Sequence, residues 1–415
     1  MGVVVPKLKS YDKTLNCVPD KSISIRAVIL NGYAVGKSTV KNISLCDDVK
    51  SAAQCVRALG ASVEFDGDTA HIVGAPFRSA KLDCGNSATV ARLLIGLLSG
   101  LNGVFELDGD SSLRARPMRR VIAPLREMGA DITDTDGRLP VKIVGAPLSG
   151  GSFDFRIPSA QVKSAVILAG LNASDTVSVT ESIKTRDHTE NMLRVMNGRI
   201  TTDGNTVTVA PSIVYSRDIT VTGDLSGAVY PLCVALGVKG GKCTVKNVGL
   251  NPTRTAVFDV LKSSGANIVI TGSTGGAEPC GDVSAEYGVL KPIRVDADVA
   301  PKIIDEIPAL CALACAIDGE SVFAGADELR VKESDRIRTV VAALKSLGAD
   351  ISETSDGMIV RGGKPLSFGE VKTCGDHRIA ISAAVAGAIG AGAVIDDGDC
   401  VAVSYPDFFK EVIGV

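Results

Sequence analysis

One pattern recurs along this chain of 415 residues and limits the folds that it can adopt. Each copy has an apolar helical stretch that ends at a small turn residue, followed by a strand, a polar turn and a second strand. Five copies are visible, and their turn glycines are Gly60, Gly129, Gly198, Gly265 and Gly348. A spacing of roughly 65–85 residues is too long for a solenoid repeat and fits a small α/β unit. Glycine is typical of a helix C-terminus, and the sequence therefore predicts a repeated α/β module.

The strand pairs in these copies alternate apolar and polar residues, and turn residues such as Asp136-Gly137 separate them. This pattern indicates β-hairpins packed with helices, which is an α+β architecture. A divergent sixth copy could come from the two termini. The helical stretches that carry almost no charge should be buried, with sheets outside them; they are Ala88–Leu98, Val162–Leu171, Gly227–Leu236, Ile307–Ala316 and Ile379–Ile389. The copies divide into two lobes near Val221–Gly227.

Composition excludes several classes of function. The formal charge of −3 leaves no polybasic surface for nucleic acid. The apolar runs are too short to cross a membrane, and the N-terminus lacks the features of a signal peptide. Eleven cysteines without a C-x-x-C pair are typical of buried, reduced thiols, and the three histidines are too scattered for a zinc site. We expect a cytoplasmic protein with no metal and no membrane or nucleic-acid partner.

The segment Pro19–Leu30 places charge at the mouth of an apolar helix. Asp20 or Ser22 can cap the helix, and Ser22 and Arg26 are four residues apart and share one face. Lys21 adds positive charge at the same end, where free N–H groups favour an anion such as phosphate or carboxylate. The plainer interpretation is a solvated helix start.

Similar clusters precede other apolar helices. Asn86 can cap the Ala88 helix, Pro117 suits the first turn of the helix after four closely spaced arginines, and Ser159 can cap the Val162 helix. Each cluster also has an ordinary reading as a cap or a basic surface. The three clusters are Cys84–Arg92, Leu113–Arg120 and Ile157–Ser164.

Three further clusters lie in the second half of the chain: Asp305-Glu306, Arg330–Arg336 and Asp376-His377-Arg378. On a helix, Lys332 and Arg336 would share a face, and Glu333 between them could transfer protons. A surface ion-pair network, or first-turn capping by Asp305 and Glu306, is the alternative. Many ionic clusters at helix starts in both halves predict a cleft between two lobes that holds a small polyanion.

The motifs together resemble the EPSP synthase (3-phosphoshikimate 1-carboxyvinyltransferase) family along essentially the whole chain. The resemblance rests on Asp20–Ser24, Gly85–Ser87, Arg116–Met118, Ser159–Ser164, Arg330–Arg336 and Asp376–Arg378. It implies two lobes of three βαβαββ units each, an inverse α/β barrel arrangement, with residues 1–17 and 223–415 in one lobe and 18–222 in the other. It also implies a shikimate-pathway reaction toward chorismate and aromatic amino acids: transfer of the enolpyruvyl group of phosphoenolpyruvate (PEP) to the 5-hydroxyl of shikimate 3-phosphate.

The resemblance assigns roles to individual residues, without an organic cofactor or metal. The implied catalytic residues are Asp305 at the 5-hydroxyl, Glu333 at the PEP methylene carbon, and Lys21. The implied shikimate 3-phosphate ligands are Lys21, Ser22, Arg26, Ser159, Ala160, Gln161, Arg186, Asp305 and Lys332. The implied PEP ligands are Lys21, Asn86, Arg116, Gln161, Arg336 and Arg378.

Two positions depart from the family pattern. Ala88 stands where many members have glycine beside the PEP site, and its methyl group should weaken inhibition by glyphosate while PEP still binds. Val403 stands where some relatives place a lysine on the PEP phosphate, and that contact should be missing or supplied elsewhere.

Competing interpretations make different predictions. A UDP-N-acetylglucosamine enolpyruvyl transferase would show Lys-Asn at Lys21-Ser22 and a reactive cysteine within Gly109–Arg116, and this chain has neither. A non-catalytic phosphosugar-binding relative would have lost Asp305, Glu333 or Lys21. A nucleic-acid enzyme is disfavoured by the acidic balance. We expect a monomer whose partners are its two small-molecule substrates.

Overall fold

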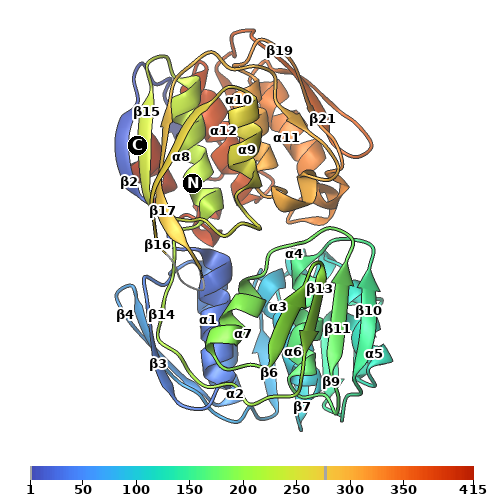
Figure 1. Ribbon diagram of the computed structural model, residues 1–415. Helices are drawn as coiled ribbons and strands as arrows, with labels where there is room; N and C mark the ends of the chain where they lie inside the picture. The colour runs from blue at the N-terminus through green and yellow to red at the C-terminus, as the bar shows by residue number, and fades with distance from the viewer. Residues whose placement is uncertain (1, 275–277) are drawn as a thin grey trace. The chain divides into compact units, whose positions relative to one another are not determined.

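The computed structural model describes residues 2–274 and 278–415, and the chain forms two compact units (Figure 1). Unit 1 consists of Met1–Val18 and Thr222–Val415, and unit 2 consists of Pro19–Val221. Helices and strands alternate along both units, which confirms the predicted α+β class. Among the described residues, no helix is long and apolar enough to cross a membrane.

Unit 2 contains three four-stranded sheets, each with one parallel pair followed by two antiparallel pairings. In sheet order, the strands are β14 (Ile219–Thr220), β3 (Lys37–Lys41), β5 (Thr69–Val73), β4 (Ser62–Asp66); β6 (Ala80–Asp83), β7 (Val104–Asp108), β9 (Arg138–Val144), β8 (Asp131–Thr135); and β10 (Gly151–Phe155), β11 (Val177–Glu181), β13 (Thr206–Val209), β12 (Ile200–Asp203). The helices are α1 (Lys21–Tyr33), α2 (Asp47–Leu59), α3 (Ala88–Ser99), α4 (Ser111–Ala115), α5 (Arg119–Glu127), α6 (Ala160–Gly170) and α7 (His188–Val195).

Unit 1 repeats this plan with two four-stranded sheets and one three-stranded sheet among its described residues. In sheet order, the strands are β2 (Asp12–Asn16), β15 (Lys242–Gly249), β17 (Cys280–Glu286), β16 (Asn267–Thr274); β18 (Arg294–Val295), β19 (Gly319–Phe323), β21 (Met358–Gly362), β20 (Asp350–Glu353); and β1 (Val3–Val5), β23 (Ala393–Ile395), β22 (Gly369–Val371). The helices are α8 (Leu225–Gly237), α9 (Ala256–Ser263), α10 (Ile307–Ala314), α11 (Arg336–Ser346) and α12 (His377–Ile389), with short helices η1 (Ala300–Lys302), η2 (Asp327–Val331), η3 (Asp399–Val403) and η4 (Phe409–Ile413).

The sixth copy of the repeat comes from both ends of the chain, as the sequence indicated. Strand β1 near the N-terminus pairs antiparallel with β23, with Val4 opposite Val394, and β23 pairs parallel with β22. Each unit therefore holds three copies of one α/β module.

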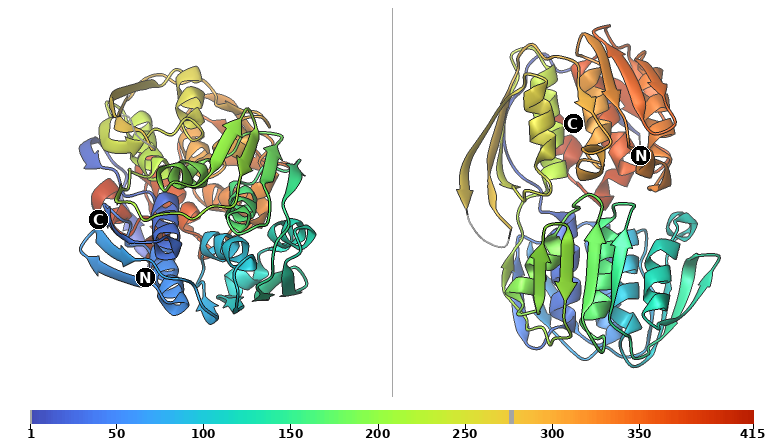
Figure 2. Two further views of the ribbon diagram at one scale, coloured as in Figure 1. Left: turned by 60° about the horizontal axis from the view of Figure 1, so that its bottom comes forward. Right: turned by 45° about the vertical axis from the view of Figure 1, so that its right-hand side comes forward.

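The helices with almost no charge form the interior of each unit, which confirms their predicted burial. Nearly every residue of α3, α6, α8, α10 and α12 is buried, and the sheets lie on the outside (Figure 2). Helices α3 and α6 approach closely at Gly96, where an added Cβ would lie 2.1 Å from the carbonyl oxygen of Ala165. A helix that is apolar on all sides is stable only in such an enclosed position.

The turn residues of the repeat have the backbone conformation that the pattern predicted. The described turn residues with positive φ are Gly60 (115°), Gly129 (98°), Gly265 (87°), Gly348 (81°) and, in the third copy, Asn197 (66°). In that copy the left-handed residue is therefore the asparagine before Gly198, because asparagine also tolerates this region. The Asp136-Gly137 hairpin has positive φ at both residues, as a type I′ turn requires.

All eleven cysteines are free thiols, as predicted, although three of them are not fully buried. Cys374 is exposed, and Cys280 and Cys400 are partly exposed. Within residues 2–274 and 278–415, no group of three or more His, Cys, Asp or Glu residues could hold a metal ion.

Candidate functional site

The first predicted anion site forms at the start of α1 in unit 2. Asp20 is the cap, and its side chain accepts a hydrogen bond of 2.9 Å from the Ile23 N–H. Ser22 and Arg26 follow on the helix, and Arg26 Nη1 donates to the Ser22 carbonyl at 3.0 Å. Lys21 lies 3.3 Å from Asp48 Oδ2. The predicted helix start is confirmed, and it gathers a lysine and an arginine at the positive end of the helix dipole.

Arg26 is buried and connects three helices. Its Nε donates to Thr189 Oγ1 on α7 at 2.7 Å, and its Nη2 donates to Ser164 Oγ on α6 at 3.3 Å. Sequence reasoning gave Arg26 a ligand role only. The structure shows that this guanidinium also holds the start of α7 against α1 and α6.

The start of α3 differs from the prediction in its cap. Ser87, rather than Asn86, caps this helix by accepting from the Val90 N–H at 3.3 Å, and its hydroxyl donates to Asp48 Oδ2 at 2.9 Å. Asp48 therefore lies between Ser87 and Lys21 and links the starts of α1 and α3.

Asn86 does not cap the helix and instead forms hydrogen bonds with two neighbouring segments. Its Nδ2 donates to Asp110 at 2.7 Å, and its Oδ1 accepts from Arg116 Nη2 at 2.7 Å. The prediction that Asn86 caps α3 was wrong, because the helix begins at Ala88 and Ser87, one residue later than predicted, is its cap. The predicted PEP ligands Asn86 and Arg116 are nevertheless in contact.

The four-arginine cluster separates into different environments. Arg116 is buried, whereas Arg114 is exposed and pairs with Asp108 at 2.6 Å, and its hydrogen bonds lower the pKa of the Asp108 carboxyl. The prediction that Pro117 lies in the first turn of the next helix was wrong, because α5 begins at Arg119 after Met118. Asp108 thus neutralises Arg114, and the neutral Asn86 side chain holds Arg116 in place by a hydrogen bond.

The start of α6 agrees with the prediction. Ser159 caps the helix by accepting from the Val162 N–H at 3.5 Å, and Ala160 is its first residue. Gln161 reaches α3, where its Nε2 donates to Thr89 Oγ1 at 2.9 Å and its Oε1 accepts from Arg92. The starts of α1, α3 and α6 are therefore joined by side-chain contacts at one end of unit 2. Arg186 lies in the loop between β11 and α7 and is partly exposed.

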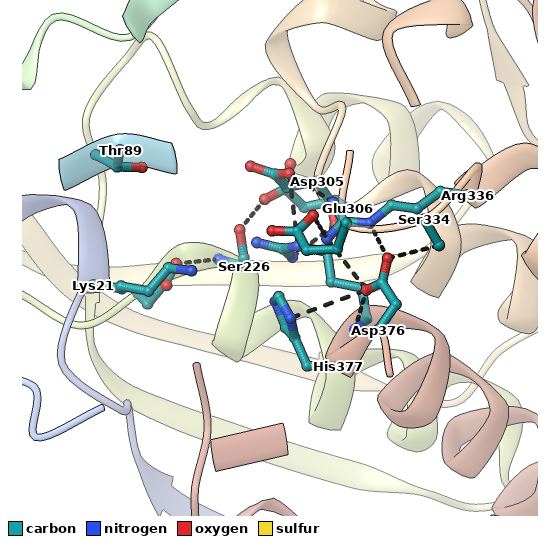
Figure 3. Close-up of polar contacts among 12 residues, drawn as sticks. Lys21, Thr89, Ser226, Asp305, Glu306, Ser334, Arg336, Asp376 and His377 are labelled. Atoms are coloured by element: carbon teal, nitrogen blue, oxygen red, sulfur yellow. Dashed lines mark hydrogen bonds and ion pairs between the residues drawn. The ribbon is translucent and has the colours of Figure 1, made fainter. Parts of the chain in front are cut away.

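In unit 1, a buried arginine joins three carboxylates (Figure 3). Arg336 Nε donates to Asp376 Oδ2 at 2.9 Å, its Nη1 lies 3.4 Å from Asp305 Oδ1, and its Nη2 donates to Glu333. Burial alone would lower the pKa of Arg336, but Asp376 and Glu333 outweigh it and raise the pKa. Burial likewise opposes the charge of Asp376, and Arg336 outweighs it, so that the pKa of this carboxyl is lowered.

Arg378 provides a second buried cation beside the same acids. Its Nη1 donates to the Asp305 carbonyl at 2.8 Å and to the Tyr230 hydroxyl at 3.2 Å, and its Nε lies 3.6 Å from Asp305 Oδ1. Asp376 caps α12 by accepting from the Arg378 N–H at 3.0 Å. The predicted residues Asp305, Glu333, Arg336 and Arg378 are thus assembled at the starts of α10, α11 and α12.

Contrary to the prediction, the segment around Lys332 is not helical. Lys332 follows the short helix η2, and α11 begins only at Arg336 after its cap Asp335. Lys332 and Arg336 therefore do not share a helical face. Three non-helical residues, 333–335, allow Glu333 to turn back onto Arg336 instead of pointing along a helix.

Asp305 and Glu306 do not cap α10, which contradicts the plainer interpretation of this acidic pair. The described start of α10 has no side-chain capping bond. Glu306 is buried and accepts from Ser226 and from Arg254 Nη2, the latter at 3.2 Å. This network joins the start of α8 to the start of α10 (Figure 3).

Sequence reasoning missed the acids and hydroxyls that hold the predicted cations in place. Asp48, Asp376, Glu306 and Ser226 were not given such roles. A usable signal existed for Asp376, because an acid at a helix start one residue before a buried segment is a typical cap. The contacts of Asp48 and Glu306 join residues distant in sequence, and no local pattern reports them.

The arrangement can bind anions and move protons. In unit 2, cations and helix starts collect at one end, and in unit 1 two buried guanidiniums lie beside Asp305 and Glu333. Charged donors of this kind bind phosphate and carboxylate groups strongly. Glu333 is partly exposed, and it is therefore accessible for proton transfer. Val403, at the end of η3, places no cation in this region.

Comparison with known proteins gives a consistent result. The sequence model described as EPSP synthase (3-phosphoshikimate 1-carboxyvinyltransferase) matches residues 5–412. A 3-phosphoshikimate 1-carboxyvinyltransferase from Roseiflexus castenholzii is 43% identical over 405 residues, covering 94% of each chain, and one from Geobacillus kaustophilus is 44% identical over 405 residues, covering 95% of each.

Solved structures agree with the sequence matches. EPSP synthase from Acinetobacter baumannii has a TM-score of 0.85 at 36% identity and covers 99% of this chain and 96% of that chain. The enolpyruvyl transferase NikO from Streptomyces tendae has the same fold, with a TM-score of 0.80 at 17% identity over 99% of this chain and 97% of that chain. From the matched sequence and the shared fold, it follows that this chain belongs to the EPSP synthase family.

Proposed function

We propose that this chain transfers the enolpyruvyl group of PEP to the 5-hydroxyl of shikimate 3-phosphate and releases inorganic phosphate. The observation that carries the proposal is the family match over residues 5–412, together with 40–44% identity to relatives of that activity. The paired sets of cations and carboxylates at helix starts are the chemical equipment that this reaction needs.

In the proposed reaction, the 5-oxygen of shikimate 3-phosphate forms a bond to C2 of PEP, and C3 of PEP gains a proton. The bond between C2 and the phosphate oxygen then breaks, and C3 loses a proton, which restores the double bond. Glu333 gives and takes the proton at C3, and Asp305 accepts the proton of the 5-hydroxyl. The cations stabilise the phosphates and the carboxylate and hold both substrates in attack geometry.

The proposed ligands divide between the substrates as the family resemblance assigns them. Shikimate 3-phosphate is held by Lys21, Ser22, Arg26, Ser159, Ala160, Gln161, Arg186, Asp305 and Lys332. PEP is held by Lys21, Asn86, Arg116, Gln161, Arg336 and Arg378. Each set draws on both halves of the chain, residues 18–222 and residues 1–17 with 223–415.

The decisive test is phosphate release from PEP that depends on shikimate 3-phosphate, measured for the wild type and for Glu333→Gln. Removing a general acid–base group costs about 10²–10⁴-fold in rate, and we expect kcat to fall at least about 100-fold while KM for PEP changes little. Glu320→Gln is the matched control, because Glu320 also pairs with an arginine, Arg361, at 3.2 Å but is exposed. A wild type that releases no phosphate would refute the proposed activity, and a fully active Glu333→Gln variant would refute the proposed role of Glu333.

We also propose that the enzyme acts as a monomer in the cytoplasm and that Ala88 makes it insensitive to glyphosate. Free thiols throughout the chain are consistent with a reducing compartment. Sedimentation velocity of the purified protein checks the oligomeric state: a single species of about 43 kDa is expected, and a stable dimer would contradict it.

A further inference from the structure

The proposed reaction does not use a buried ion triad in unit 2, which consists of Lys163, Glu181 and Glu190. The Lys163 ammonium on α6 lies 2.8 Å from Glu181 Oε2 and 2.8 Å from Glu190 Oε1. All three side chains are 1% exposed. Isolated charges in such a place would be very costly, and they persist only when they are paired.

The triad joins three elements that are separate in the sequence. Lys163 lies in α6, Glu181 is the last residue of β11, and Glu190 lies in the first turn of α7. In Figure 1 the labelled α6, α7 and β11 belong to the same unit. The segment between β11 and α7 is therefore attached to α6 at both of its ends.

The same groups bind the backbone directly before Arg186. Lys163 Nζ donates to the Thr185 carbonyl at 3.3 Å. Glu181 accepts from the Thr185 N–H at 3.2 Å and from the Thr185 hydroxyl. Both polar backbone groups of Thr185 are thus held by buried charges, and the peptide that leads into Arg186 has a defined position.

The charge of Lys163 is maintained by its partners. Burial alone would lower the pKa of the ammonium, but Glu190 and Glu181 outweigh it and raise the pKa. Lys163 therefore remains protonated at neutral pH. A second contact next to the triad, between Ser164 Oγ and Thr189 Oγ1 at 2.7 Å, adds to the attachment of α7.

We propose that Lys163, Glu181 and Glu190 form a positioning device that fixes the Thr185-Arg186 segment and thereby sets the affinity for the phosphate of the acceptor substrate. This inference rests on the proposed function, because Arg186 is one of the proposed shikimate 3-phosphate ligands. The three residues act through Arg186 and do not touch the substrate.

The test uses Lys163→Met, which removes the ammonium and keeps a similar length of side chain, in the full-length enzyme. We expect the Kd for shikimate 3-phosphate, measured by calorimetry, and its KM to rise about 10-fold, while KM for PEP changes less than about 2-fold. Lys81→Met is the matched control, because Lys81 also pairs with a glutamate, Glu106, at 3.0 Å but on the surface of the same unit. Its affinity should equal that of the wild type.

A double-mutant cycle with Arg186→Ala separates positioning from general destabilisation. If Lys163 acts through Arg186, the double variant binds shikimate 3-phosphate no more weakly than Arg186→Ala alone. Fully additive losses, or an unchanged Kd in Lys163→Met, would overturn the inference while the proposed function stands. A wild type that does not bind shikimate 3-phosphate would overturn the proposed function as well.

A second variant covers the case in which Lys163→Met fails to fold. Thr185→Val removes the hydroxyl that donates to Glu181 and leaves the ion triad intact. We expect an increase of about 3-fold in the Kd for shikimate 3-phosphate, which disappears in the Arg186→Ala background. An unchanged Kd in this variant, or an equal loss in both backgrounds, would overturn the inference.

Discussion

At the scale of single residues, candidate-site cations such as Arg336 and Lys21 are paired with acids and are not isolated charges. Arg336 contacts Asp305, Glu333 and Asp376, and Lys21 contacts Asp48. A buried cation without such partners would lose its charge or destabilise the fold. The acids therefore have two effects: they keep the cations charged and they hold them in fixed positions for an incoming anion.

Asp376 offers a direct test of this pairing. Asparagine at position 376 keeps an oxygen for the Arg378 N–H cap but removes the negative charge beside Arg336. Breaking a buried pair by removing one partner costs about 3 kcal/mol or more, and we expect Asp376→Asn to lower the unfolding free energy by about 3 kcal/mol. Urea denaturation measures this loss, and Asp350→Asn, at an acid with exposed partners, is the control. A loss below about 1 kcal/mol would contradict the account.

The same carboxyl gives a pH dependence with a defined sign. Its pKa in the folded protein is lowered, whereas an unfolded aspartate titrates near about 3.9. The folded state then binds fewer protons than the unfolded state, and the contribution of Asp376 is complete above about pH 4 and is lost as the pH falls through its folded pKa. As the pH falls below about 4, the unfolding free energy of Asp376→Asn should therefore decrease less steeply than that of the wild type. Unfolding free energies of the two proteins that decrease in parallel as the pH falls would contradict this expectation.

Ala88 determines the expected response to glyphosate. It is the first residue of α3 and is 7% exposed, so that its methyl group occupies space at a helix start. We expect Ala88→Gly to lower the glyphosate concentration for half inhibition at least about 10-fold, with KM for PEP changed less than about 3-fold. Glycine in a helix costs about 1 kcal/mol at most, so the variant should fold. Tight inhibition of the wild type would contradict the assignment.

At the scale of elements, the repeat was readable because each copy carries its own local signals. Left-handed turn residues, hairpin turns and helices with almost no charge are properties of short segments, and the structure confirms them. Asn86, Pro117 and Lys332 show where that reasoning ends. Their predicted roles depended on where a helix begins, and a shift of one to four residues moved the cap to Ser87 and the helix starts to Arg119 and Arg336.

Long-range partners could not be predicted from the sequence. Asp48 lies 39 residues before Ser87, and Asp376 lies 40 residues after Arg336. Such contacts exist only after the helices pack, since neither residue has a local pattern that points to its partner. Local charge patterns therefore predicted the clusters and the family resemblance predicted the roles of their residues, while the network that holds them is visible only in the structure.

The close approach of α3 and α6 predicts that a side chain at position 96 disturbs the packing of these two helices. A Cβ at Gly96 would lie 2.1 Å from the Ala165 carbonyl oxygen, and the helices would have to separate. Overpacking of this kind costs about 1–3 kcal/mol, and Gly96→Ala should lower the unfolding free energy by about 2 kcal/mol and raise KM for both substrates. Gly288→Ala is the control, because no atom lies within 4 Å of its added Cβ. Equal stability of the two variants would contradict this packing argument.

At the scale of the whole molecule, the proposed reaction needs groups from both units. Unit 2 carries Lys21, Arg26, Arg116 and Gln161, whereas unit 1 carries the acids Asp305 and Glu333. In each unit, three copies of one module direct the starts of their buried helices to a common end. A repeated module thus supplies several helix N-termini for anions, although the net charge of the chain is only −3.

Hydrogen exchange measured by mass spectrometry, with both substrates present and with neither, tests the proposed use of groups from both units most directly. We expect both substrates together to slow exchange at the starts of α1 and α6 in unit 2 and at the starts of α11 and α12 in unit 1, because bound groups stabilise the segments that hold them. Protection confined to one unit, or absent from all four helix starts, would contradict the account.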